Sequence, residues 1–295
     1  MTNGPKTIND RIVDVLMYTI LTLIGLMTLF PMYYVIIMSI TPLQETIRNG
    51  GFAFFPSEIT FSAYKAIFAS PRLPQSLKVT TIITVVGTIL NLLFTLLLAY
   101  PLSRKQMPGR KLCLMLIVFT MIFNGGLIPT YLVVKEFGLL DSIWSLIVPG
   151  LITTFNLLIA KTFFENLSVE IQEAAKIDGC NDLQTLWLIV IPLSKAIIAT
   201  LGLFYAVSHW NEFFAGIMYI TNPKLYPLQV ILRDMLQQPN LSVEMMNQVQ
   251  GLESALPPFA IRMAMVVATT LPILFVYPFV QKYFTKGVML GAVKG

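Results

Sequence analysis

Long apolar stretches separated by short polar segments dominate the pattern of this 295-residue chain. A helix needs about 20 mostly apolar residues to cross the hydrocarbon core of a bilayer. The stretches that approach or exceed this length cover residues 13–40, 77–101, 111–129, 142–164, 195–220 and 259–281. The pattern therefore predicts an all-α integral membrane protein with six transmembrane helices, in which residues 1–295 form a single transmembrane domain.

The third predicted span contains an interruption near its end. Asn124, Gly125 and Gly126 have low helix propensity, and Pro129 lacks a backbone N–H donor. We therefore expect the helix to end or break there. Residues 130–140 are predicted to form a short amphipathic piece at the membrane surface.

The composition supports lipid as the main surroundings of the chain. Charged residues make up 12% of the sequence and hydrophobic residues 56%, with a mean hydropathy of +0.74. Soluble domains carry about 25% charged residues. The apolar run after Arg11 is much longer than the apolar part of a signal peptide, about 7 to 15 residues, so it is predicted to remain as the first span.

The basic residues predict the orientation in the membrane. Lys and Arg gather in cytoplasmic loops, and the loop between the second and third spans carries Arg104, Lys105, Arg110 and Lys111 without an acidic residue. An even number of spans places both termini on one side, which this loop predicts to be cytoplasmic. Because no longer basic cluster occurs, the net charge of +5 is not interpreted as a nucleic-acid-binding surface.

The sequence contains few residues that could form a metal-binding site or a nucleotide-binding site. Cys113 and Cys180 are far apart and His209 is the single histidine, so neither a metal centre nor a disulfide framework is expected. The chain also lacks the phosphate-binding pattern GxxxxGK[ST]. No cofactor is therefore expected in this chain, and any ATP must be bound by a partner.

Residues 165–192 carry the most informative motif. Glu173, Ala174 and Ala175 favour a short helix, and Gly179 can adopt the left-handed conformation that ends it. A second short helix is predicted from about Asp182. The loop is therefore expected to present two short helices joined at a glycine, with small side chains that let another protein approach the backbone.

This loop resembles the hallmark of the permease subunits of ATP-binding cassette (ABC) importers, which is Glu-Ala-Ala, three residues, Gly, nine residues and Ile-x-Leu-Pro. The matching residues are Glu173, Ala174, Ala175, Gly179, Ile189 and Pro192, with Ile191 in place of the usual Leu. Further segments resemble carbohydrate importers, and among them the second permease subunit of maltose-type systems in the branch for complex oligosaccharides. These segments are Leu29-Phe30-Pro31, Gly50-Gly51-Phe52, Asn124 to Tyr131 and Lys282 to Gly295.

The resemblance implies a type I ABC importer permease fold in a bacterial inner membrane. It implies a second homologous permease chain, two ATPase subunits that bind ATP and Mg, and an extracytoplasmic solute-binding protein. Residues 165–192, including Asp178, would couple to an ATPase subunit. The tail 283–295, with Lys286, Gly291 and Lys294, would contact the ATPase subunits, and the long polar loop 222–258 would reach the binding protein. An oligosaccharide is the implied substrate, and the residues leave open whether it derives from uronic acids.

Two polar groups within the spans are candidates for the transport pathway. Thr81, Thr84, Thr88, Asn91 and Thr95 recur every three or four residues and so lie on one helix face. They could offer hydrogen bonds to a sugar or to neighbouring helices, and the pattern leaves both open. His209, Asn211 and Glu212 could line a sugar-facing wall, form a gate or make a structural knot, although His209 itself is expected to be a hydrogen-bonded helix residue.

The sequence gives less support to two other functional classes. A secondary transporter driven by an ion gradient needs ionisable groups within the membrane, for which Glu212 is the clear acidic candidate. A membrane-embedded enzyme needs a nucleophile, a base or a metal cluster, which the spans lack. Lys161 and Glu165, four residues apart, are interpreted as an exposed or snorkelling pair without a function.

Overall fold

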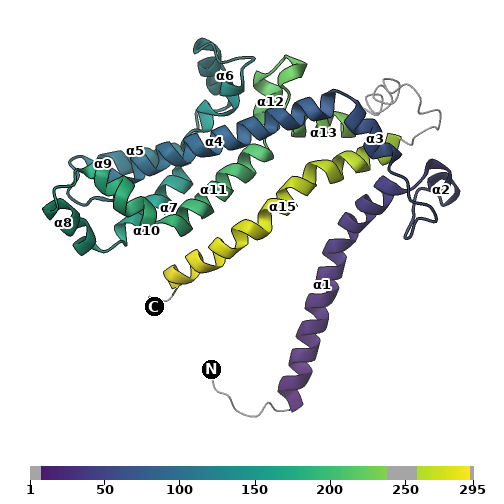
Figure 1. Ribbon diagram of the computed structural model, residues 1–295, viewed down its shortest axis with the longest axis horizontal. Helices are drawn as coiled ribbons and strands as arrows, with labels where there is room; N and C mark the ends of the chain where they lie inside the picture. The colour runs from purple at the N-terminus through teal and green to yellow at the C-terminus, as the bar shows by residue number, and fades with distance from the viewer. Residues whose placement is uncertain (1–7, 238–257, 293–295) are drawn as a thin grey trace. The chain divides into compact units, whose positions relative to one another are not determined.

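The structure is a computed structural model that describes residues 8–237 and 258–292 (Figure 1). These residues form helices joined by turns and loops, and none of them lies in a β-strand. The contacts divide the chain into two compact units. One unit comprises Met1–Ser70 and Met235–Thr269, and the other comprises Pro71–Asp234 and Thr270–Gly295.

The first unit is built around α1, Ile8–Ile40, which contains the first predicted span. The helices α2, Leu43–Arg48, and α3, Ser62–Ala69, follow it. The hydroxyls of Ser39 and Tyr64 lie 2.7 Å apart and hold α3 to the end of α1. The most apolar part of α1 is not buried by other described residues. A helix that is apolar all round and uncovered fits surroundings of lipid or other subunits.

The second unit is organised around α4, Arg72–Ser103, the second predicted span. It packs along α7, Thr154–Glu165, and α11, Lys195–Trp210 (Figure 1). Their shared apolar core consists of Leu96, Ala99, Tyr100, Leu102, Leu157, Ala160, Phe164, Leu186, Val190 and Leu201. Burial of this core fixes the positions of the chain segments on either side of residues 165–192.

A second apolar cluster lies at the other end of α4. It joins Val79 and Ile83 to α6, Leu127–Glu136, to the 3₁₀ turn η1, Ile143–Leu146, and to α12, Phe214–Tyr219. Asp141, with φ +55°, links the chain before η1 to the chain after α12 at this end of the unit. Its carboxylate accepts hydrogen bonds from the Thr221 N–H at 2.6 Å, the Thr221 hydroxyl at 2.5 Å and the Asn222 N–H at 2.9 Å.

The predicted break in the third span is confirmed. The helix α5, Arg110–Ile122, ends before Asn124, and α6 continues at an angle of 115° to it. Gly126 adopts φ +88° at this corner, in the left-handed range that a side chain disfavours. The predicted surface piece 130–140 coincides largely with α6, which starts three residues earlier.

The fourth and fifth predicted spans are interrupted in the structure. Residues 142–164 form η1, a second 3₁₀ turn η2, Val148–Gly150, and α7, with a bend of 49° between the turns and α7. Pro149 and Gly150 disfavour helix at this break. Residues 195–220 break after Trp210, where the Glu212 carboxylate accepts the Ala215 N–H at 2.9 Å and starts α12 instead of continuing α11.

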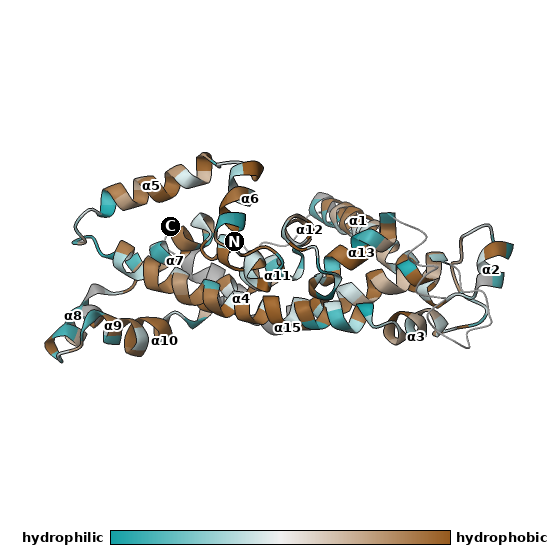
Figure 2. Ribbon diagram, turned by 90° about the horizontal axis from the view of Figure 1, so that it is seen from above, coloured by the Kyte–Doolittle hydropathy of each residue, from teal (hydrophilic) through white to brown (hydrophobic). Residues whose placement is uncertain are grey.

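The helices agree with a protein that crosses a membrane several times. In the part of the chain that the structure describes, three helices are long and apolar enough to span a bilayer, or up to six spans if each bent helix pair counts as one. Figure 2 shows hydrophobic residues along α4 and α5 and hydrophilic residues in the short helix α8, Val169–Ile177.

The predicted outer loop and tail are covered only in part. The loop 222–258 begins with η4, Pro223–Leu225, and α13, Leu228–Gln237, before the chain leaves the described residues. The last helix, α15, covers Pro258–Ala292. It therefore continues through most of the predicted tail 283–295 instead of ending near residue 281.

Candidate functional site

Residues 165–192 form the predicted pair of short helices. The helix α8, Val169–Ile177, ends at Gly179, whose φ is +83°. The helix α9, Asp182–Thr185, starts with a capping box in which the Gln184 N–H donates to Asn181 Oδ1 at 2.8 Å and the Asn181 N–H donates to Gln184 Oε1 at 2.9 Å. The sequence prediction of two helices joined at a glycine is confirmed.

The start of α8 differs in detail from a simple N-cap. Ser168 occupies the N-cap position without a side-chain bond to the backbone of α8. Its hydroxyl instead donates to the carboxylate of Glu170, and this hydrogen bond lowers the pKa of Glu170. The ionised carboxylate lies in the first turn, where it interacts favourably with the positive end of the helix.

The second half of the loop anchors it to the core. After α9 the chain forms a π-helical turn η3, Leu186–Val190, and a short α10, Ile191–Leu193. Leu186 and Val190 are buried in the core of the second unit. The chain then bends by 86° between the segment Asp182–Leu193 and α11, so this segment runs at a steep angle to the span that follows it.

The helix α8 exposes apolar side chains that a folded chain in water would normally cover. Ala175 is 3% exposed and faces inward, whereas Ile171 is 42% and Ile177 is 86% exposed. Ala174 is also exposed and offers only a methyl group. Exposed apolar side chains that lie together on a surface mark contact sites for proteins or membranes. Glu173 and Asp178 are exposed on the same short helix and its C-cap.

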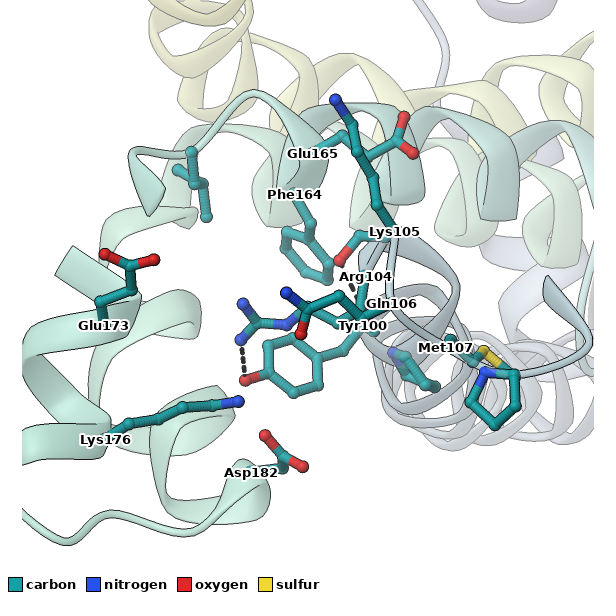
Figure 3. A pocket seen from close by; sticks show the side chains of 14 residues that line it. Tyr100, Arg104, Lys105, Gln106, Met107, Phe164, Glu165, Glu173, Lys176 and Asp182 are labelled. Carbon is teal, nitrogen blue, oxygen red and sulfur yellow. Dashed lines mark hydrogen bonds between the residues drawn. The ribbon is translucent and has the colours of Figure 1, made fainter. Parts of the chain in front are cut away.

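A pocket of about 720 Å³ lies between the α8–α9 segment and the end of α4 (Figure 3). Arg104 lies over the ring of Tyr100, 4.5 Å from its centroid, and donates to the Tyr100 hydroxyl. Lys176 and Asp182 enter the pocket from the opposite side (Figure 3). No ion pair crosses the pocket between the residues that the structure describes, so the α8–α9 segment is not held to α4 there.

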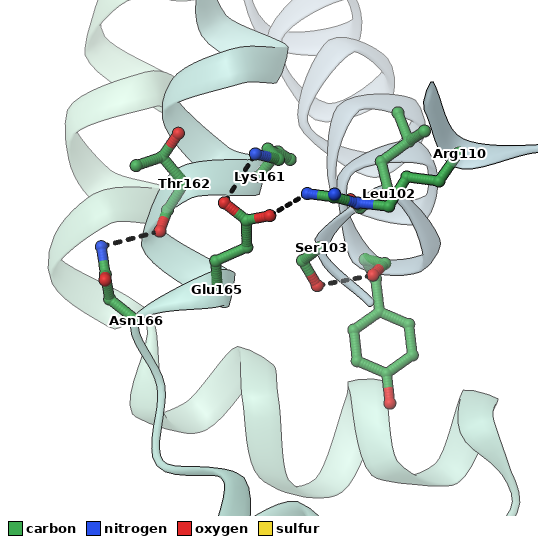
Figure 4. Close-up of polar contacts among 8 residues, drawn as sticks. Leu102, Ser103, Arg110, Lys161, Thr162, Glu165 and Asn166 are labelled. Atoms are coloured by element: carbon green, nitrogen blue, oxygen red, sulfur yellow. Dashed lines mark hydrogen bonds and ion pairs between the residues drawn. The ribbon is translucent and has the colours of Figure 1, made fainter. Parts of the chain in front are cut away.

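An ionic cluster of Arg110, Lys161 and Glu165 lies beside this pocket (Figure 4). Lys161 Nζ is 2.6 Å from Glu165 Oε2, and an Arg110 Nη2 donates to Glu165 Oε1. The three side chains are 15% to 20% exposed. The pairing of Lys161 with Glu165 is confirmed, but the pair is half-buried and not exposed. Arg110, 55 positions from Glu165, adds a second cation that the local sequence pattern did not predict.

The structure brings together two of the pathway candidates, Asn91 and His209. His209 Nε2 lies 2.9 Å from Asn91 Oδ1, and Asn91 Nδ2 donates to the Gly150 carbonyl at 2.8 Å. Asn91 is 1% and His209 8% exposed. These polar groups therefore bond helices to one another in this conformation, as expected for His209.

The other candidates have varied surroundings. Thr81 is exposed, and its hydroxyl donates to the Leu77 carbonyl at 2.8 Å. The hydroxyls of Thr84 and Thr88 are buried and have no hydrogen-bond partner among the described residues. Asn211 is exposed and donates to the Val207 carbonyl at 2.9 Å. Thr84 and Thr88 thus retain hydrogen-bonding capacity beside the Asn91 and His209 pair.

Comparison with known proteins decides the family. Residues 66–290 match the protein family described as the binding-protein-dependent transport system inner membrane component. The chain belongs to this family. This permease is 45% identical over 286 residues to Protein LplC of Bacillus subtilis (strain 168), covering 97% of this chain and 96% of that protein.

Two further comparisons extend over nearly the whole permease. It is 43% identical to the polygalacturonan/rhamnogalacturonan transport system permease protein YtcP of Bacillus subtilis (strain 168), covering 97% of this chain and 99% of that protein. It is also similar to a chain in the crystal structure of a bacterial ABC transporter involved in the import of the acidic polysaccharide alginate, with a TM-score of 0.90 and 33% identity. That match covers 96% of this permease and 100% of the other chain.

Family membership confirms several predictions from the sequence. The chain is an all-helical, multi-pass permease of the inner membrane and is not itself an ATPase. It is one component of an ABC transporter complex, in which ATP hydrolysis belongs to a partner. This result favours the ATP-driven importer over the transporter driven by an ion gradient. Of the predicted tail residues, Lys286 and Gly291 lie in α15 and Lys294 lies outside the described residues, so their role stays a prediction.

Proposed function

We propose that this permease forms half of the translocation pathway of an ATP-driven importer of oligosaccharides. The names of its relatives support this substrate class, because YtcP is described as a permease for polygalacturonan and rhamnogalacturonan. The similar solved structure is described as an importer of the acidic polysaccharide alginate. Oligosaccharides derived from uronic acids are therefore the substrates we would test first.

The proposed complex contains four kinds of subunit. This permease pairs with a second homologous permease chain, two ATPase subunits bind ATP and Mg, and a solute-binding protein delivers the sugar from outside. Both termini and residues 165–192 lie on the cytoplasmic side in this arrangement. ATP binding then alternates the access of the pathway between the two sides of the membrane.

The exposed surface of α8 is the observation that carries the proposed coupling to ATP. Ile177 is 86% exposed, Ala174 permits close approach, and Glu173 and Asp178 supply charges beside them. Gly179 ends α8, and Ile189 and Pro192 lie in the turn η3 and the helix α10 that follow α9. The segment therefore has the form and surface needed to dock against an ATPase subunit.

Pathway lining is proposed for the α4 hydroxyls of Thr81, Thr84 and Thr88. The hydroxyl groups of a sugar lose their hydrogen bonds to water when the sugar enters the membrane, and protein hydroxyls can replace them. The hydroxyls of Thr84 and Thr88 have no partner among the described residues, and that of Thr81 is exposed and can still accept a hydrogen bond. The buried Asn91 and His209 pair and the helix-capping Glu212 support the walls beside this path. Asn211, which is exposed next to Glu212, is proposed to face the pathway. The tail residues Lys286, Gly291 and Lys294 are proposed to contact the ATPase subunits.

Reconstitution of the whole transporter tests this function. The permease, its partner permease and the ATPase subunits are placed in proteoliposomes, with the binding protein outside and ATP and Mg inside. We expect uptake of tritiated oligogalacturonides that requires ATP, Mg and the binding protein and that persists when ionophores collapse the proton and sodium gradients. Uptake that survives without ATP but stops with the ionophores would refute the proposal.

A further inference from the structure

The cluster of Arg110, Lys161 and Glu165, here called the Glu165 cluster, joins the ends of three helices (Figure 4). Glu165 is the last residue of α7, and Arg110 is the first residue of α5. The Arg110 Nε also donates to the Leu102 carbonyl at 2.8 Å, in the last turn of α4. The last carbonyls of a helix have no partner within it, so Arg110 binds the end of α4 and the carboxylate of α7 at once.

The connection from the Glu165 cluster to α8 is short and ordered. Only residues 166–168 separate α7 from α8. The Asn166 N–H donates to the Phe163 carbonyl at 3.1 Å, the Leu167 N–H donates to the Phe164 carbonyl at 3.3 Å, and Asn166 Nδ2 donates to the Thr162 carbonyl at 3.0 Å. A movement of α8 should therefore also move the end of α7, because no long loop separates the two helices.

Among the described residues, the other routes from α8 to α4 lack directional contacts such as hydrogen bonds or ion pairs. The pocket of about 720 Å³ lies between Lys176 of α8 and Arg104 near α4, and no described ion pair crosses it. Leu186 and Val190 do pack against the core, but apolar contact is not directional and permits sliding. The Glu165 cluster supplies hydrogen bonds whose geometry depends on direction.

The charges make Glu165 the shared member of the cluster. Its two carboxylate oxygens each bind a different cation, and the side chain is only 20% exposed. Loss of this negative charge would leave Arg110 and Lys161 to repel each other, in surroundings where charges are less screened than in water. We propose that Glu165 is a positioning residue that transmits the movement of α8, driven by the ATPase, to α4 and α5. This inference rests on the proposed function.

The test compares ATP hydrolysis with sugar uptake in the reconstituted transporter. Glu165→Gln keeps the shape of the side chain but removes its charge, and Arg110→Gln removes the other side of the contact. We expect each variant to raise the number of ATP molecules hydrolysed per tritiated oligogalacturonide imported by about fivefold or more, the lower end of typical coupling between sites. Poor folding alone would lower both activities together and leave this ratio unchanged.

The double variant and a matched control separate a specific contact from a general effect. Arg110→Gln combined with Glu165→Gln should raise the ratio no more than the larger single effect, because both changes remove one interaction. Glu136→Gln is the control, since Glu136 also ends a helix, α6, but is exposed and forms no ion pair with the described residues. The control should keep the wild-type ratio.

Two outcomes would overturn the inference. The first is a wild-type ratio in intact transporter that carries Glu165→Gln. If that variant does not assemble, Arg110→Lys replaces it, because Lys keeps the charge but has one nitrogen in place of the two guanidinium nitrogens that separately bind Leu102 and Glu165. A wild-type ratio for Arg110→Lys is the second. If the wild-type transporter shows no ATP-dependent uptake, the proposed function fails first, so the two failures are distinguishable.

Discussion

The contact between Gly87 of α4 and His209 of α11 leads to a prediction with a defined size. A Cβ atom placed on Gly87 would lie 2.5 Å from Nε2 of His209 and 2.8 Å from its Cδ2 and Cε1. These distances are shorter than side chains tolerate, so the imidazole must move in Gly87→Ala. The movement would break or lengthen the hydrogen bond between His209 and Asn91, which now measures 2.9 Å.

The expected loss of stability combines three contributions. Extra volume in a packed interior costs about 1 to 3 kcal/mol. The lost hydrogen bond costs about 0.5 to 1.5 kcal/mol. Replacement of Gly by Ala within a helix returns about 1 kcal/mol. The free energy of unfolding should therefore fall by about 0.5 to 3.5 kcal/mol. At about 2 to 4 °C per kcal/mol, this lowers the melting temperature by roughly 1 to 14 °C.

The assay is thermal unfolding of the purified permease in detergent, followed by intrinsic fluorescence. Gly202→Ala is the matched control because Gly202 lies in α11, where an added Cβ would be 3.4 Å from Leu92 Cδ1. This control should keep or raise the melting temperature. In a His209→Ala background the ring is absent, so Gly87→Ala should cost little. Equal melting temperatures for Gly87→Ala and Gly202→Ala would refute this reasoning.

Three further predictions concern the α8 surface, the α8–α9 turn and the outer end. Ala174→Trp should abolish stimulation of the ATPase by the binding protein without lowering the melting temperature of the permease, whereas Leu132→Trp at an exposed site of α6 should keep stimulation. Gly179→Ala forces a side chain into φ +83° and should weaken the turn by about 1 to 2 kcal/mol, seen as faster amide hydrogen exchange in residues 169–185 than in wild type. The hydrogen bond from the Thr221 hydroxyl, followed by those from the backbone, holds the pKa of Asp141 below 3.8. Its contribution to stability is thus complete above pH 3.8 and disappears as the pH falls through the lower folded-state pKa, so Asp141→Asn should lower the melting temperature at pH 7 and converge with wild type in strong acid. Unchanged ATPase stimulation in Ala174→Trp would contradict the first prediction, and unchanged amide exchange in Gly179→Ala would contradict the second. The third would be contradicted if the difference in melting temperature between Asp141→Asn and wild type grew in acid.

Local signals in the sequence determined the membrane class and the form of the α8–α9 segment. The length of an apolar run determines whether a helix can cross a bilayer, and this predicted the spans that contain α1, α4 and α15. Gly179 and the residues before it encode a helix end within a few positions, so the α8–α9 segment was predictable. The breaks at Pro149 and Glu212 were missed, because an average of hydropathy over a span does not register one proline or one capping carboxylate.

Only the tertiary structure decided which polar side chains meet. Asn91 and His209 are 118 positions apart, and Arg110 and Glu165 are 55 apart. Each side chain can bond many partners, and its own neighbourhood in the chain does not specify which one it will contact. The choice depends on the packing of α4, α7 and α11, whose apolar surfaces bring these groups together. The sequence alone therefore determined that the chain crosses a membrane and carries a segment of two short helices joined at Gly179, whereas packing determined how that segment is joined to the other helices.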